Sequence, residues 1–260
     1  MNLERGKFMK ISKQIDVIVQ ARMSSTRLPG KVLMQGCGKP MLHHMIERLR
    51  WIPEVSNIII ATTLNDKNDC IVELADQLGV WCFRGDEDDV LGRVVKAANH
   101  FETDVIVAIT SDDPLLDPDV SSEVIRNFVE REDEVDFVTN DLEVTFPIGF
   151  NTRAFTRKLL ELVEKEATHP LDREHVVNYI CKRPDKFRIH NVKAEGIHRR
   201  PDLRLTLDTK EDYKVIKAVF DALYTKNPRF TAKDIYGFLD NHPHIRDSNK
   251  NVIQETYDYD

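Results

Sequence analysis

The hydrophobic residues of this chain fall into short runs that alternate with segments of helical spacing. Nearly continuous apolar runs predict buried strands at 15–20, 57–62, 80–83, 104–109 and 135–139. Between these runs, apolar residues recur every three or four positions, which predicts helices at 41–50, 69–78, 89–101 and 118–130. Strands that are apolar along their whole length are covered on both faces. The alternation therefore predicts an α/β fold, with a mostly parallel sheet and helices on both of its faces.

The second half of the chain has a less regular pattern. It predicts strands at 187–192 and 203–207 and helices at 155–165, 174–182, 212–223 and 232–240. The length of 260 residues fits one α/β domain with a small appendage. We therefore predict a flexible tail over 1–14, a single domain over 15–260, and an inserted or appended segment near 141–200.

Composition and charge narrow the classes of function. Hydrophobic residues make up 41% and charged residues 31%, which is enough for a packed core. The formal net charge of −7 argues against a protein that coats nucleic acid. No apolar run approaches the roughly 18 residues of a membrane span, and the polar start does not fit a signal peptide. The four scattered cysteines show no zinc spacing. We predict a soluble cytoplasmic protein without nucleic-acid or membrane partners.

The loop after the first predicted strand gathers cations and hydroxyl groups. Residues 20–31 read QARMSSTRLPGK, with Arg22, Arg27 and Lys31 beside three hydroxyl side chains and a Pro-Gly turn. In open parallel sheets, ligands bind beyond the carboxyl ends of the strands. A bent loop with guanidinium and ammonium donors suits a triphosphate, although the G-x-x-x-x-G-K-[ST] phosphate loop is absent. The alternative interpretation is a solvated basic loop.

Two carboxylates stand at the ends of other predicted strands. Asp112 follows the strand at 104–109 within Thr-Ser-Asp-Asp-Pro, and Asp208 closes the segment 203–207. Carboxylate oxygens are ligands that hard cations such as Mg²⁺ prefer, so the two acids could share a metal. The sequence alone does not show that they meet, and Asp-Asp-Pro is also a common turn.

Together these segments resemble the cytidylyltransferase family of the spore-coat polysaccharide type. That family is related to the synthetases of CMP-activated 3-deoxy-octulosonate and of CMP-activated nonulosonic (sialic-like) acids. The similarity spans about residues 15–215. It rests on the segments 19–31 (VQARMSSTRLPGK), 61–63 (ATT), 83–91 (FRGDEDDVL), 110–115 (TSDDPL), 146–149 (FPIG), 173–176 (REHV) and 204–208 (RLTLD).

This resemblance implies a glycosyltransferase-A-like (Rossmann-like) nucleotidyltransferase fold that binds CTP. It places Thr62, Arg84 and Gly85 where the family reads cytosine, and Asp112 and Asp208 where related enzymes hold Mg²⁺. It also implies a homodimer as one option. The nucleotide-binding residues expected from the first loop, of which the three cations also act in catalysis, are Gln20, Ala21, Arg22, Ser25, Thr26, Arg27 and Lys31.

One departure from the family pattern concerns the acceptor of the nucleotidyl group. The family often carries two acids in its P-x-G-x-D-x-E-x-F segment, whereas this chain has Asn151 and Arg153 there. The guanidinium favours an anionic acceptor, gripped by the segment near 141–200. The expected acceptor-binding residues are Asn140, Arg153, Glu174 and His175. A purely structural role is the alternative for His175, ahead of a role as general base.

The predicted function is transfer of CMP from CTP to an anionic sugar acid or phosphorylated metabolite, with release of pyrophosphate. Such a product would serve the biosynthesis of a surface polysaccharide, a capsule or another glycan. One alternative is a nucleotide-sugar glycosyltransferase, which needs a D-x-D motif. The candidates at 86–88 and 117–119 both begin predicted helices, where acids cap. The other alternative is a non-catalytic nucleotide-binding homologue.

Overall fold

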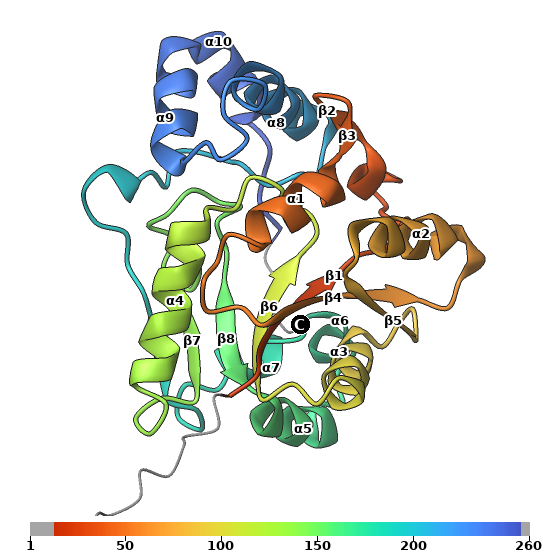
Figure 1. The fold of residues 1–260 in the computed structure, drawn as a ribbon. Coiled ribbons are helices and arrows are strands. Elements are labelled where there is room, and N and C mark those ends of the chain that lie inside the picture. Colours follow the sequence, from red (N-terminus) through yellow and green to blue (C-terminus); the bar gives the residue numbers. More distant parts are fainter. Residues whose placement is uncertain (1–12, 256–260) are drawn as a thin grey trace, which may run out of the picture.

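A seven-stranded sheet forms the centre of the molecule in the computed structural model, which describes residues 13–255 (Figure 1). Its strands are β1 (Ile15–Gln20), β4 (Asn57–Thr63), β5 (Trp81–Gly85), β6 (Val105–Thr110), β7 (Phe137–Thr139), β8 (Arg153–Thr156) and β9 (Ile189–Asn191). Their order across the sheet is β5-β4-β1-β6-β8-β7-β9. A small hairpin of β2 (Gln35–Gly36) and β3 (Lys39–Pro40) lies apart.

The sheet is mostly parallel, as the apolar strands predict. Strand β1 pairs in parallel with β4 and with β6, and β4 pairs in parallel with β5; only β8 runs against its neighbours β6 and β7. Gln20 is in register with Ala61 on one side and Thr110 on the other. The carboxyl ends of three central strands therefore open at the same edge of the sheet.

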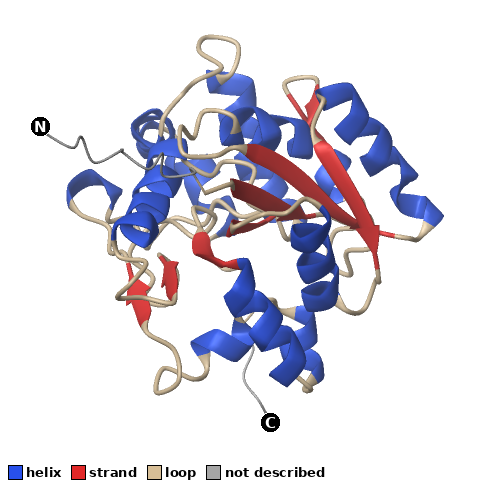
Figure 2. Ribbon diagram, turned by 60° about the horizontal axis from the view of Figure 1, so that its bottom comes forward, coloured by secondary structure: helices blue, strands red, loops and turns tan. Residues whose placement is uncertain are grey.

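Helices cover both faces of this sheet, and Figure 2 shows the strands between them. Alternate residues of β1 pack on opposite faces: Ile18 joins the core under α3 and α5, whereas Val17 and Val19 join the core under α1, α2 and α4. The helices are α1 (Met41–Leu49), α2 (Asp69–Leu78), α3 (Val90–His100), α4 (Pro118–Glu130), α5 (Arg157–Glu166), α6 (Pro170–Glu174), α7 (Asn178–Cys181), α8 (Lys210–Leu223), α9 (Ala232–Asn241) and α10 (Pro243–Arg246).

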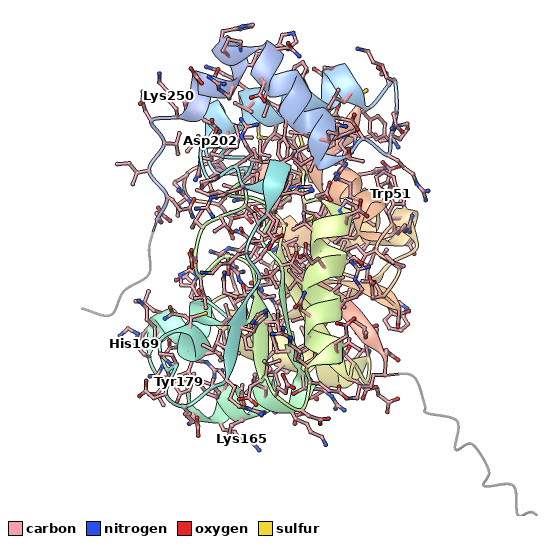
Figure 3. All side chains as sticks on the ribbon, turned by 90° about the vertical axis from the view of Figure 1, so that its left-hand side faces the viewer. Trp51, Lys165, His169, Tyr179, Asp202 and Lys250 are labelled. Atoms are coloured by element: carbon pink, nitrogen blue, oxygen red, sulfur yellow. The ribbon has the colours of Figure 1, made fainter. Side chains whose placement is uncertain are left out.

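The C-terminal helices α8, α9 and α10 pack together at one end of the molecule (Figure 1). Figure 3 shows Asp202 and Lys250 at this end, and Lys165, His169 and Tyr179 at the opposite end. The buried guanidinium of Arg48 in α1 links the C-terminal helices to the rest of the domain. It donates to the carbonyl oxygen of Leu116, between β6 and α4 (2.6 Å), and to that of Phe230, between α8 and α9 (3.0 Å).

Three local predictions in the second half are wrong. Residues 153–156 form β8, so the helix predicted from 155 begins at Arg157. Of the helix predicted at 174–182, only Glu174, the last residue of α6, and Asn178–Cys181, which form α7, are helical. The strand predicted at 203–207 makes only one bridge, between Ile148 and Arg204. Its leucines alternate because Leu203, Leu205 and Leu207 pack into the core beside α8, which imitates the pattern of a strand.

The structure leaves the first twelve residues undescribed, so most of the tail predicted over 1–14 lies outside it. Gln14, next to the first strand, donates its side-chain amide to Asp16 (2.7 Å) and to the Phe101 carbonyl (2.9 Å). Within residues 13–255, no helix has the length and apolar character that a bilayer span requires.

Candidate active site

The loop between β1 and the 3₁₀ helix η1 (Lys31–Leu33) forms one wall of a cavity at the strand ends. It turns back on itself, since Gly30 donates its N–H to the carbonyl oxygen of Met23 (3.0 Å). Met23 in turn donates to the Asn68 side chain (2.8 Å). Gly30 has φ 72°, a left-handed conformation that glycine adopts without strain. This turn places Lys31 on the wall of the cavity.

The ammonium of Lys31 lies between the two predicted metal ligands. Its Nζ is 3.4 Å from Asp112 Oδ2 and 2.9 Å from Asp208 Oδ1. Asp112 and Asp208, which are 81 and 177 residues from Lys31 in the sequence, therefore meet in the structure, as a shared metal site requires. Burial opposes the charge on Lys31, but the two carboxylates outweigh it and raise its pKa. Burial likewise opposes charge on Asp112, and Lys31 outweighs it, so the pKa of Asp112 is lowered.

Asp208 reaches this position by a route other than the predicted strand. Leu207 donates its N–H to the Asp112 carbonyl oxygen (2.7 Å), which holds the two acidic segments together. Ile148 donates its N–H to the Leu203 carbonyl oxygen (3.0 Å), and its own carbonyl oxygen accepts from the Leu205 N–H (2.6 Å). A Cβ atom on Gly149 would lie 2.5 Å from the carbonyl carbon of Leu205. The absence of a side chain at Gly149 therefore permits this close approach.

Arg204 and Arg27 complete the surroundings of Asp208. Arg204 donates to Asp208 Oδ2 (3.0 Å) and to both carboxylate oxygens of Asp212 (2.9 and 3.2 Å). Arg27 is 3.2 Å from Asp208 and 3.3 Å from Glu255. The buried guanidinium of Arg204 thus holds one carboxylate oxygen of Asp208. The other oxygen faces Arg27 and Lys31, which belong to the loop after β1.

The cavity has a volume of about 740 Å³ and takes its walls from both halves of the chain. It brings together most of the residues predicted from the sequence, including the proposed nucleotide, metal and acceptor residues. The predicted residues on its wall are Gln20, Ala21, Arg22, Ser25, Thr26, Arg27, Lys31, Asp112, Asn140, Arg153, Glu174, His175 and Asp208.

Three predicted residues are not on the cavity wall: Thr62, Arg84 and Gly85. Thr62 is fully buried in β4. Arg84 turns toward the neighbouring loop, where it donates to the Thr63 carbonyl (3.0 Å) and to Asp69 (2.7 Å). Their predicted role in reading cytosine stays a prediction, but the described geometry gives it no position from which to act.

The residues predicted to face the acceptor differ in how they are held. Asn140 fixes the loop before β8, since its side chain donates to the Phe150 carbonyl (2.8 Å) and accepts from Thr152 N–H (2.9 Å). Arg153 forms an ion pair with Asp141, which also lines the cavity. Glu174 is 3.7 Å from Arg22. Burial lowers the pKa of the half-buried His175 imidazole, against the opposing charge of Glu174.

Comparison with known proteins places this geometry in a family. The model of the family described as "Cytidylyltransferase" matches residues 17–235, which include most of β1, the loop after it and both acidic segments. The chain belongs to the cytidylyltransferase family. The resemblance suggested by its sequence motifs is thereby confirmed.

Two relatives of this cytidylyltransferase match it over nearly their whole length. An uncharacterised protein of Methanocaldococcus jannaschii is 36% identical over 245 residues, which cover 92% of this chain and 96% of the relative. A spore coat polysaccharide biosynthesis protein of Bacillus subtilis is 31% identical and covers 87% and 94%. The solved structure of a cytidylyltransferase from Leptospira borgpetersenii superposes with a TM-score of 0.85 at 31% identity, covering 95% of this chain and all of that one. The predicted nucleotidyltransferase fold is confirmed.

The acidic end of the cavity fits a hard cation in its chemistry. Asp112 Oδ1 and Asp113 Oδ1 are buried and have no hydrogen-bond partner among the described residues. The part of the chain that the structure describes holds no group of three or more His, Cys, Asp or Glu arranged around a metal position. Mg²⁺ commonly uses only one or two carboxylates and takes its remaining ligands from phosphates and water. Asp112 and Asp208 meet that requirement.

The sequence interpretation missed several residues of this cytidylyltransferase site. Arg93 and Asp113 line the cavity, as do Gln254 and Glu255 near the C-terminus. Burial and the neighbouring Asp112 raise the pKa of Asp113 well above its usual value. Asp113 could have been found from its place beside Asp112. Arg93 could not, because VLGRVV reads as an ordinary helix segment.

Proposed function

We propose that this cytidylyltransferase transfers CMP from CTP to an anionic small molecule and releases pyrophosphate. The acceptor oxygen attacks the α-phosphorus, a new P–O bond forms, and the bond between the α-phosphorus and the bridging oxygen breaks. Negative charge develops on the leaving pyrophosphate during this step. Positioned cations carry most of the catalysis in such reactions, with little covalent work for the protein.

The single observation that carries this proposal is the junction of Lys31 with Asp112 and Asp208. A cation and two carboxylates meet where the loop of β1 faces the segment after β6. Phosphates would be drawn to Lys31, Arg27 and Arg22, all on the cavity wall. Asp112 and Asp208 would hold Mg²⁺, which supplies charge neutralisation at the α-phosphate when bound. Lys31 would then exchange carboxylate partners for phosphate oxygens.

An anionic acceptor is supported by Arg153. Its pair with Asp141 uses Nη2, while its buried Nε has no hydrogen-bond partner in the described part of the chain. Part of the guanidinium is therefore left to bind a carboxylate or phosphate within the cavity. Sugar acids and phosphorylated metabolites for surface glycans have this chemistry. Cytoplasmic location and homodimer formation stay predictions.

A glycosyltransferase activity is less well supported, because both D-x-D candidates hold local structure. Asp117 caps α4 by accepting from the N–H groups of Asp119 (3.0 Å) and Val120 (3.2 Å). Asp86 accepts from the N–H groups of Asp88 and Asp89, each at 2.9 Å. Neither segment offers a free pair of carboxylates for a metal.

The test is a pyrophosphate-release assay with CTP and Mg²⁺ over a panel of anionic acceptors. The panel should include a nonulosonic acid, a 3-deoxy-octulosonate and phosphorylated polyols, with uncharged sugars as controls. We expect pyrophosphate only with CTP and an anionic acceptor, and none when EDTA removes the metal. Release of a nucleoside diphosphate from a nucleotide sugar, without CTP turnover, would instead identify a glycosyltransferase. Binding of CTP without turnover on any acceptor would indicate a nucleotide-binding homologue.

A further inference from the structure

Arg93 is a buried arginine that approaches the cavity from the first turns of α3. The residue is only 2% exposed, yet it forms part of the cavity wall. The stem of Arg93 lies against the end of β5, since a Cβ atom added to Gly85 would be 2.9 Å from Arg93 Cγ. Arg93 therefore lines the cavity beside the end of β5. Arg84, which belongs to β5, instead donates to Thr63 and Asp69.

One edge of the Arg93 guanidinium holds the chain, and the other edge is unused. Nη1 donates to the carbonyl oxygens of Asp86 and Glu87 and so fixes the turn between β5 and α3. Among residues 13–255, neither Nε nor Nη2 has a hydrogen-bond partner, and Nε is buried. A buried donor without an acceptor costs free energy. A ligand that supplies acceptors at this edge would remove that cost.

The neighbouring wall is small and apolar. Val90 lies one helical turn before Arg93 on the same face of α3. Ala21, directly after β1, and Ala108 in β6 contribute short side chains. A donor edge beside an apolar surface suits a flat heteroaromatic ring with two adjacent acceptors. Arg22 also lies near enough to act on Arg93 electrostatically, so a phosphate between the two cations is the competing interpretation.

We propose that Arg93 is the residue that distinguishes cytosine from uracil in this site. This inference rests on the proposed function, because it assumes that a cytidine nucleotide enters the cavity. Cytosine presents O2 and N3 side by side as acceptors, which matches the two donors at the free edge of the guanidinium. Uracil carries a hydrogen on N3, so a donor would face a donor. The mismatch leaves one buried group unpaired and lowers the affinity for uridine nucleotides.

The experiment measures binding, so it does not depend on knowing the acceptor. Isothermal titration gives the affinities of CMP, UMP and inorganic pyrophosphate for the wild type, Arg93→Gln and Arg93→Lys. We expect the wild type to prefer CMP to UMP. Both variants should weaken CMP by about 10-fold or more and leave the affinities for UMP and pyrophosphate nearly unchanged. Lys96→Gln removes an exposed charge from the same helix and should change none of the three.

Two patterns of lost affinity would overturn the proposal. Equal weakening of CMP and UMP would assign Arg93 to a part of the nucleotide that both share. A loss confined to pyrophosphate would assign it to the terminal phosphates, beside Arg22. If Arg93→Gln does not fold, Gly85→Ala is the second variant, because its methyl group must displace the Arg93 stem; it should reduce the preference for CMP in the same direction.

The failure of the proposed function would look different. In that case the wild type itself would show no preference for CMP over UMP and no pyrophosphate release with CTP. A wild type that releases pyrophosphate from CTP, together with an Arg93 variant that keeps the full preference for CMP, would refute the role of Arg93 alone.

Discussion

Lys31 contacts both carboxylates of the site, Asp112 and Asp208. Its loop position suggests a solvated side chain whose removal would leave stability intact. In the structure only 13% of its side chain is exposed, and it neutralises Asp112 and Asp208 at once. Its removal therefore has consequences for folding as well as for phosphate binding.

We predict that Lys31→Ala lowers the free energy of unfolding at pH 7 by about 1–3 kcal/mol, since two carboxylates lose a shared cation. Mg²⁺ should raise the melting temperature of this variant more than that of the wild type, because the ion can replace the ammonium. Thermal unfolding with and without Mg²⁺ measures both effects. Exposed Lys226→Ala serves as the control. An identical Mg²⁺ response in the variant and the wild type would argue against metal binding by these two acids.

Arg153 yields a second prediction at the residue scale. Replacement of Arg153 by Glu would reverse the charge of this side chain, place a carboxylate against Asp141 and disturb the fold. Arg153→Gln removes the guanidinium and its charge without placing a like charge beside Asp141. We expect it to raise the KM of the acceptor at least about 10-fold, as loss of a charge-assisted contact does, with a small change in the KM of CTP. Asp141→Asn tests whether loss of the ion pair alone raises the KM of the acceptor. If Arg153→Gln changed the KM of CTP more than that of the acceptor, the assignment of Arg153 to the acceptor would be wrong.

At the scale of elements, α1 and α8 are joined by a buried histidine. His44 donates its Nε2–H to the Gly36 carbonyl oxygen (2.6 Å) and stacks on Phe220, with ring centroids 4.0 Å apart. Burial lowers the pKa of its imidazole, against the Gly36 bond and Glu47. The folded state therefore favours neutral His44, whereas an unfolded histidine binds a proton near its usual pKa of about 6.5.

The sign of the pH dependence follows from this shift. The stability due to neutral His44 is complete above about pH 6.5 and is lost as pH falls through the lowered pKa of the folded state. We predict that the free energy of unfolding decreases more between pH 7.5 and pH 5.5 in the wild type than in His44→Gln. Denaturant titrations at both pH values measure the difference, and other histidines cancel because both proteins share them. Parallel losses would exclude His44 as the source.

The elements also show where sequence reasoning succeeds. The strands at 15–20, 57–63 and 105–110 were predictable because each is apolar along its length and covered on both faces. Strand β8 was not, since Arg153–Thr156 becomes a strand only by pairing with β6 and β7. The cavity loop was predictable from its dense cations. The orientation of Arg84 was not, because it depends on Asp69 and two carbonyl groups of a neighbouring loop.

At the scale of the whole molecule, the C-terminal segment returns to the cavity. Asn249 anchors it by donating to the Arg204 carbonyl (3.0 Å) and to Asp212 (2.9 Å). Gln254 then accepts from Arg204, and Glu255 lies beside Arg27. A carboxylate from the end of the described chain thus pairs with a cation that we assign to the triphosphate.

We predict that deletion of residues 252–260 lowers the KM of CTP by about two- to five-fold, the range expected when a partly exposed ion pair is removed. Glu255→Gln should reproduce most of the effect. Steady-state kinetics in CTP measure it, with Asp202→Asn, a carboxylate that does not line the cavity, as the control. An increase in KM on deletion would mean that the segment helps to hold the nucleotide.

The wide separation of the site residues along the chain also concerns how the protein folds. Lys31 and Asp208 are 177 positions apart, so their contact requires the closure of a very long loop of chain. Such distant contacts form slowly, since chain entropy is lost before they stabilise anything. The β1 loop and the ends of β4 and β6 beside it lie within the first 110 residues, whereas the acidic pair requires Asp208 as well. Catalytic competence should therefore be the last property that a newly made chain acquires, and the recovery of activity on refolding should lag behind the recovery of helical signal.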